Sequence, residues 1–234
     1  MGLEQALGKY EYFLNDEDAS IYIGASGVET YKDKVDFVLS PEEINEFLQK
    51  AMDFNFEQHR YSEITGMYVT KLMQNYINAC SDYPFFKLDL PVELDCLGFG
   101  LKAKGAFLFL DIKGNLGDSC FTGSLGCSAD IFGDVKDNFA RCSMHSFFRV
   151  TGNVGYGSAG HSQKCVYEFF QKVGRGFDCA ESNEFRAFTP EGLKTLKKYV
   201  PAGNSISYLE KDKFVDIKRL RDKFPFLEKF MRRH

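Results

Sequence analysis

Apolar and polar positions alternate in short stretches between residues 95 and 190, and these stretches recur every 19 residues. Two apolar columns emerge when the repeats are aligned: Ile112, Ile131, Val150 and Phe169, and, two residues earlier, Leu110, Ala129, Phe148 and Tyr167. Charged residues occupy the position between them: Asp111, Asp130, Arg149 and Glu168. Alternation with a period of two predicts one strand in each repeat, with the apolar columns facing inward.

A glycine followed by asparagine or aspartate ends three of the predicted strands, at Gly114, Gly133 and Gly152. Glycine suits such turns because it adopts backbone angles that other residues avoid. The next inward column is expected to contain Leu97, Leu116, Val135, Val154 and Val173. A fixed period of this length is typical of a solenoid. The sequence therefore predicts a mainly β protein built on a short parallel β-helix, with about five 19-residue coils over residues 95–188.

The segments on either side of the coils are predicted to be caps, because bare solenoid ends expose unpaired backbone groups. Residues 1–94 are expected to form an α/β cap with a helical segment, and residues 189–234 an α/β cap with a basic helical tail. Helices are expected at 1–14, 41–54, 57–80, 189–199 and from 212 onward, and strands at 20–27, 34–40 and 204–210.

Two packing expectations follow from this layout. The C-terminal cap is expected to fold back on the last coil near Val173 and Phe177. The outward aromatic residues are expected to be covered by the flanking helices, and these residues are Phe109, Phe132, Phe147 and Phe170.

Three glycine-rich phrases carry a resemblance to known families: IKGNLGDSCFTGS at 112–124, IFGDVKDNFARCS at 131–143 and VTGNVGYGSAGHS at 150–162. They resemble the Gly-rich (GXGXG) β-helix that is found in the glutamate synthase C-terminal domain and in formylmethanofuran dehydrogenase. The wider layout resembles uncharacterised archaeal proteins with repeated GNVG coils. The resemblance implies a right-handed β-helix that serves as a scaffold.

Composition narrows the class of protein further. The chain has 234 residues and a net charge of −4, without an apolar run of membrane-spanning length or a secretory pattern. Seven cysteines without a C-x-x-C pair predict reduced thiols in a cytoplasmic protein, with neither a disulfide nor a metal site, and no cofactor is expected. Charge is uneven, since residues 1–60 carry −8 and residues 211–234 carry +5.

One candidate for chemistry emerges only from the 19-residue stacking. Cys142 and His161 fall in one column with Gly123 and Ala180, so the thiol and the imidazole lie on neighbouring coils. A thiol beside an imidazole is the minimum for an activated cysteine. The alternative interpretation, a coincidence of two surface turn residues, is favoured. The column Asn115, Asp134 and Asn153 is interpreted in the same way, as a ladder of turn hydrogen bonds.

Three functions remain open on the sequence alone. The first is a non-enzymatic β-solenoid scaffold or interaction module, with another protein or a second copy of the chain as its partner. The second is a thiol-dependent enzyme that uses Cys142 and His161. The third is an adaptor that binds RNA or an acidic partner through the tail residues Lys218, Arg219, Arg221, Arg232 and Arg233. The lack of a catalytic constellation favours the first.

Overall fold

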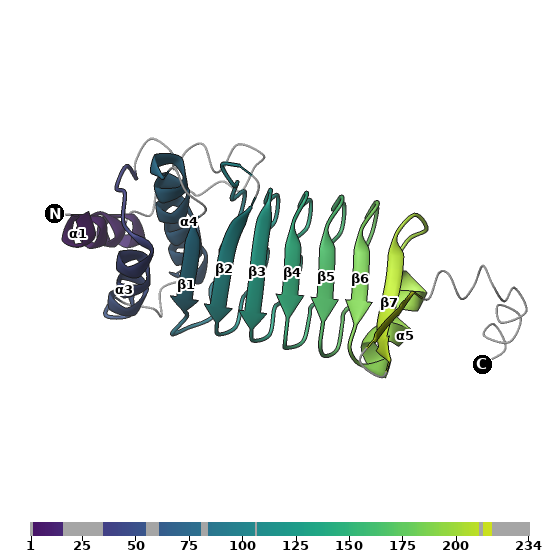
Figure 1. Cartoon of the computed structure of the whole chain (residues 1–234). Coiled ribbons are helices and arrows are strands. Elements are labelled where there is room, and N and C mark those ends of the chain that lie inside the picture. The colour runs from purple at the N-terminus through teal and green to yellow at the C-terminus, as the bar shows by residue number, and fades with distance from the viewer. Residues whose placement is uncertain are drawn as a thin grey trace, which may run out of the picture.

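A computed structural model describes residues 2–15, 35–54, 61–80, 84–105, 107–210 and 213–216. Its strands form one sheet in chain order: β1 (Phe85–Asp89), β2 (Leu108–Lys113), β3 (Cys127–Phe132), β4 (Phe147–Val150), β5 (Val166–Phe169), β6 (Glu184–Ala187), β7 (Ser205–Glu210) and β8 (Lys213–Asp216). The strands β1 to β7 are parallel, and β8 pairs with β7 in the antiparallel sense. The strands stand side by side along a rod with helices at both ends (Figure 1).

Two further ladders of single bridges run parallel to the sheet and close each coil. One joins Leu94, Leu116, Val135, Val154 and Val173, and the other joins Lys102, Leu125, Met144, Gln163 and Glu181. Each coil therefore has three sides, and the predicted parallel solenoid with stacked, buried Leu116, Val135 and Val154 is confirmed.

The 19-residue offset holds from β2 to β5 and changes at the ends of the solenoid. Phe85 pairs with Phe109, an offset of 24, and Leu94 bridges to Leu116, an offset of 22. The predicted placement of Leu97 in that column is therefore wrong. The offset falls to 18 where Val166 pairs with Glu184. The sheet also begins at β1, before residue 95, and continues beyond residue 188 into β7.

The glycines that follow the strands were predicted to supply unusual backbone angles, but two of the three are needed for another reason. Only Gly114 of the three has a positive φ, of 116°. A Cβ on Gly133 would collide with the carbonyl oxygen of Gly114, and a Cβ on Gly152 would collide with that of Gly133. Glycine is therefore required at these two positions by the close approach of stacked turns rather than by backbone angle.

The residues after these glycines form the predicted ladder of turn hydrogen bonds. Asn115 Oδ1 accepts a hydrogen bond from the Asp134 backbone N–H at 2.9 Å, and Asp134 Oδ1 accepts one from the Asn153 N–H at 2.6 Å. Each side chain thus satisfies a backbone donor of the next coil. Turn hydrogen bonds, and not a carboxylate site, explain this column.

Aromatic rings fill much of the interior of the later coils. Phe148 and Tyr167 stack with ring centroids 5.6 Å apart, and Tyr167 and Phe185 stack at 5.1 Å. Phe121 and Phe139 pack against Phe148 from the opposite turns. Neighbouring coils are therefore joined by ring contacts as well as by backbone hydrogen bonds, which accounts for part of the high phenylalanine content.

Within the described residues, the helices α1 (Gly2–Asn15), α3 (Pro41–Ala51) and α4 (Tyr61–Ala79) cover the N-terminal end of the solenoid (Figure 1). On α3, Asn45 Oδ1 accepts a hydrogen bond from the Asp89 backbone N–H at 2.8 Å, and Gln49 Nε2 donates one to the Asp89 carbonyl oxygen at 2.7 Å. Asp89 lies on β1, the first strand. Two side chains one helical turn apart therefore replace the hydrogen bonds of a missing strand.

The helix α4 caps the other sides of the first coil in the same way. Gln74 accepts from the Lys102 N–H at 2.9 Å and donates to the Lys102 carbonyl oxygen at 3.1 Å. Thr70 accepts from the Gly98 N–H, and Ser62 accepts from the Asp95 N–H, both at 2.7 Å. The predicted helical cap is confirmed, and its polar side chains pair the edge that would otherwise attract another strand.

The C-terminal cap begins with α5 (Pro190–Tyr199), whose N-cap Thr189 accepts from the Gly192 N–H at 3.2 Å. A Cβ on Gly192 would lie 3.7 Å from Val173 Cγ2, so the helix starts against the last coil as predicted. Figure 1 shows α5 at the end of the rod opposite α1, α3 and α4.

Outcomes for the other predicted elements are mixed. The helices at 2–15, 41–51, 61–79 and 190–199 and the strand at 205–210 confirm their predictions, with the capping box of Ser40 and Glu43 present at α3. Residues 35–40 form no strand, and residues 213–216 form β8 instead of the start of a helix. The strand predicted at 20–27 and the remainder of the tail helix lie outside the described residues.

Candidate functional site

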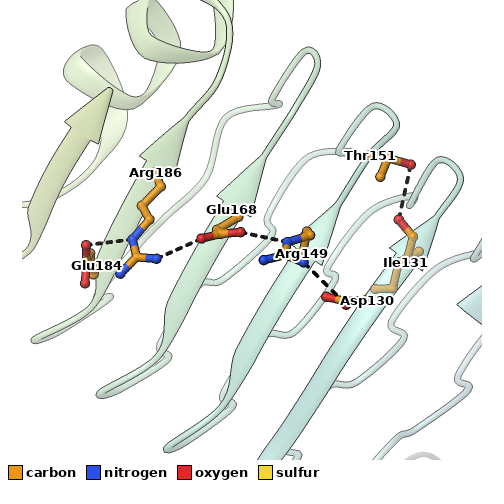
Figure 2. A network of polar contacts seen from close by, with 7 residues as sticks. All are labelled: Asp130, Ile131, Arg149, Thr151, Glu168, Glu184 and Arg186. Carbon is orange, nitrogen blue, oxygen red and sulfur yellow. Dashed lines mark hydrogen bonds and ion pairs between the residues drawn. The ribbon is translucent and has the colours of Figure 1, made fainter. Parts of the chain in front are cut away.

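A row of charged side chains crosses the outer face of the parallel sheet. Arg149 Nε lies 2.8 Å from one oxygen of Glu168, and Arg186 Nη1 lies 2.8 Å from the other. Arg186 Nε also pairs with Glu184 at 2.8 Å, whereas Arg149 Nη1 is 3.5 Å from Asp130. Figure 2 shows these side chains spanning β3 to β6.

Glu168 is the centre of this row, and its residue is only 4% exposed. A carboxylate so buried is costly unless it is paired and hydrogen-bonded. Two arginines supply that pairing, and the hydrogen bond that Arg149 donates to Glu168 in turn raises the pKa of Arg149. The fully paired half of the row, from Arg149 to Arg186, therefore stabilises the sheet.

Positive and negative charges are less evenly matched at the end of the row that lies next to β2. Asp130 lies directly opposite Asp111, so two carboxylates occupy neighbouring strands. Burial raises the pKa of Asp130; Arg149 opposes this rise, and the charges of Asp111 and Glu168 add to it. Like charges opposite one another destabilise a sheet. Lys87 on β1 lies opposite Asp111, whereas Asp130 shares Arg149 with Glu168. An additional cation placed beside Asp130 would therefore be stabilising.

Four phenylalanine side chains lie exposed beside these two carboxylates. The exposed fractions are 55% for Phe85, 42% for Phe107, 43% for Phe109 and 47% for Phe132. Phe85 and Phe109 are paired neighbours on β1 and β2, and Phe132 ends β3. These four residues are called the aromatic patch.

Exposure of the aromatic patch corrects one expectation. Helices were expected to cover the outward aromatic residues, but Phe109 and Phe132 remain exposed because the described helices pack on the ends of the rod. Other outward rings are covered by neighbours on the sheet. Phe170 stacks on Phe188 with centroids 3.8 Å apart, and the Arg149 guanidinium lies 5.5 Å from the centre of the Phe147 ring.

The structure brings Cys142 and His161 onto neighbouring coils, as the repeat predicts. The Cys142 N–H donates to the Gly160 carbonyl oxygen at 2.8 Å, and the His161 N–H donates to that of Asp178 at 2.7 Å. Both residues have a φ of 56° and lie exposed at a corner. The residue that follows in this column is Cys179 and not Ala180, because the last coil is one residue shorter.

The Cys142 and His161 side chains lie beside one another without a direct hydrogen bond in the described structure. Both side chains are open to solvent. Within the described ranges, no group of three or more His, Cys, Asp or Glu side chains is arranged to hold a metal ion. The structure places Cys142 and His161 on neighbouring coils, and the predicted role of this pair stays untested.

Native-state alkylation is expected to separate the cysteines into two classes. Iodoacetamide at pH 8 should modify exposed Cys142 and Cys179 rapidly and leave buried Cys120, Cys127 and Cys165 unmodified. Burial also raises the pKa of the Cys127 thiol to about 12, which keeps it protonated. Peptide mass spectrometry reads out the sites. Rapid labelling of Cys127 before unfolding would contradict the described core.

Comparison of the chain with protein-family models, with curated proteins and with solved structures finds no match. The described residues define a β-solenoid protein with helical caps, and the resemblance to GXGXG and GNVG proteins stays a prediction. None of the described helices has the length and apolarity needed to cross a membrane. The basic residues Lys218, Arg219, Arg221, Arg232 and Arg233 lie outside the described residues, so their predicted role stays untested.

The aromatic patch could not be recognised as a unit from the sequence. Alternation correctly placed Phe109 and Phe132 on the outer face. Phe85 joins them only through the 24-residue offset of the first coil, which the 19-residue period does not reveal. The one signal for the patch in the sequence was the pair Phe107 and Phe109, which lie on either side of the apolar Leu108.

Proposed function

We propose that this chain is a non-enzymatic β-solenoid interaction module that binds a partner protein through the aromatic patch. The observation that carries the proposal is the exposure of Phe85, Phe109 and Phe132 on one face of a regular sheet, with exposed Phe107 directly before β2. Clustered exposed apolar side chains on a folded protein mark interaction sites, and aromatic residues are enriched at interface centres. The sheet holds the rings in place, which lowers the entropic cost of binding.

Charge at the patch selects the chemistry of the partner. Lys113 lies 3.7 Å from Asp89, and Lys87 lies opposite Asp111. Asp130, beside Asp111, only shares Arg149 with Glu168, so it is the least compensated carboxylate between Phe109 and Phe132. A partner surface that is apolar and carries an arginine or lysine fits this arrangement. Its cation would lie beside Asp130 and against an aromatic ring, while its apolar groups cover the phenylalanines.

Site-specific photo-crosslinking tests the proposal. We expect p-benzoylphenylalanine in place of Phe85 or Phe109 to crosslink the same partner protein in an extract of the native source. The same probe in place of Leu125, which is also exposed but lies on another side of the coil, should not capture it. The crosslinked partner peptides should be apolar and contain arginine or lysine. Capture of only a second copy of this chain, or equal capture from position 125, contradicts the proposal.

Affinity measurements with the captured partner sharpen this test. Phe109→Ser should weaken binding by about tenfold or more, because the substitution removes a central aromatic contact. Asp111→Lys should weaken it similarly through repulsion of the partner cation. Leu125→Ser is the matched control and should leave the dissociation constant unchanged. Unchanged affinity in both patch variants would place the interface elsewhere.

The thiol-enzyme and basic-tail hypotheses have less support. Cys142 and His161 are exposed and not hydrogen-bonded to one another, which leaves the thiol without an activating contact. A role for the basic tail rests on its composition alone.

A further inference from the structure

A cleft of about 520 Å³ lies between the last turns of the solenoid and α5. Its volume falls in the range of small-molecule sites, roughly 300–1,000 Å³. The lining comes from two segments that the fold-back of α5 brings together. The turns contribute Tyr156 and Arg175, and the helix contributes Glu191, Lys194, Lys198 and Tyr199. The helix α5, which forms one wall of the cleft, lies at the opposite end of the rod from β1 (Figure 1).

Cations dominate the walls of this cleft. Lys194 and Lys198 lie one turn apart on α5, and Arg175 faces them from the turn after β5. Glu191 is the single acidic residue of the lining, and its Oε1 lies 3.8 Å from Lys172 Nζ. Three cations against one partly neutralised carboxylate leave an excess of about two positive charges, which suits a dianion.

Two tyrosines supply flat apolar surfaces beside these cations. Two cations already lie near the Tyr199 ring: Lys198 Nζ is 5.0 Å and Arg175 Cζ is 5.9 Å from the ring centre. The hydrogen bond from Lys198 lowers the pKa of Tyr199, in keeping with a positive local potential. Tyr156, in contrast, is 56% exposed and retains a surface on which a planar group can stack.

The backbone positions Tyr156 next to Arg175. The Tyr156 N–H donates to Asp137 Oδ1 at 2.7 Å, and the Gly157 N–H that follows donates to the Arg175 carbonyl oxygen at 2.7 Å. The ring leans over Gly176, since a Cβ there would lie 3.4 Å from Tyr156 Cζ. Glycine at 176 therefore leaves room for the ring beside the cationic wall.

We infer that this cleft binds a phosphate monoester whose organic group carries a planar aromatic ring, such as a nucleoside monophosphate. The phosphate dianion lies between Arg175 and the lysines Lys194 and Lys198, which donate charge-assisted hydrogen bonds. The planar ring stacks on Tyr156. This site does not depend on the aromatic patch, and either proposal can fail while the other stands.

Calorimetric titration of the full chain, in a buffer without phosphate, tests the ligand class. AMP is expected to bind, and adenosine and inorganic phosphate should each bind at least about tenfold more weakly, because each keeps only half of the contacts. Failure of AMP to bind overturns the inference. Phosphate that binds as tightly as AMP also overturns it, because the ring would then make no contact with the cleft.

Single substitutions then locate the site. Arg175→Ala and Lys194→Ala should each weaken AMP binding by about tenfold through loss of a phosphate contact. Tyr156→Ala should weaken AMP binding while leaving the weak binding of inorganic phosphate unchanged, a split that a general loss of structure would not produce. Lys87→Ala, an exposed lysine on β1, is the matched control and should bind AMP as the parent chain does. AMP binding that survives both cation substitutions would place the ligand elsewhere.

Discussion

Val135→Asp is expected to lower the free energy of unfolding on the order of 4 kcal/mol, among the largest effects of any single change in this chain. Val135 is 3% exposed and lies between Leu116 and Val154 in a bridge ladder that joins the coils. A carboxylate there has no cation or donor to replace water. Since single domains are stable by only about 5–15 kcal/mol, roughly a quarter to four fifths of the margin would be lost.

The matched control for Val135→Asp is Met144→Asp. Met144 also lies in a bridge ladder between coils, but its side chain is exposed. Chemical denaturation should show a large fall in the midpoint for Val135→Asp and a change within about 0.5 kcal/mol for Met144→Asp. Because burial raises the folded-state pKa of an introduced aspartate, the destabilisation should shrink as the pH falls through that pKa. Equal midpoints for the two variants would show that position 135 does not face the core.

Positions at the centre of the solenoid were predictable because the period is regular there. The strands from β2 to β5 keep one offset, so residues 19 apart must share a column, as Ile112 and Ile131 do. At the ends, the turns absorb extra or missing residues without disturbing the strands. That is why Leu97 and Ala180 were assigned to columns that Leu94 and Cys179 occupy.

Surface sites were less predictable because they join segments far apart in the sequence. The cleft needs α5 to fold back before Lys194 can face Arg175. The sequence indicated this fold-back through apolar content near Val173, but apolar content does not specify which polar side chains the helix then presents to the turns. The aromatic patch depends in the same way on the irregular offset between β1 and β2.

In the N-terminal cap, a four-residue spacing is visible in the sequence of α4, but its role follows only from the packing of α4 on the first coil. Ser62, Gly66, Thr70 and Gln74 recur every four residues and form one stripe along α4. Ser62, Thr70 and Gln74 pair backbone groups of the first coil. Gly66 lies between them where the helix and the coil are closest, since a Cβ there would collide with the Asp95 carbonyl oxygen and lie 3.0 Å from the Leu97 nitrogen.

Gly66→Ala is therefore expected to destabilise the protein by about 3 kcal/mol, although the same change in an exposed helix stabilises by roughly 0.5–1 kcal/mol. The added methyl group meets rigid backbone, so α4 must move away and weaken the hydrogen bonds of Ser62 and Thr70 on either side. Gly8→Ala on α1 is the matched control, because a Cβ at Gly8 meets nothing within 4 Å. Denaturation midpoints should fall for Gly66→Ala and hold or rise for Gly8→Ala, and hydrogen exchange in the first variant should accelerate at the Asp95 and Gly98 amides. A Gly66→Ala protein as stable as the parent chain would mean that α4 does not cap the solenoid by direct contact with its first coil.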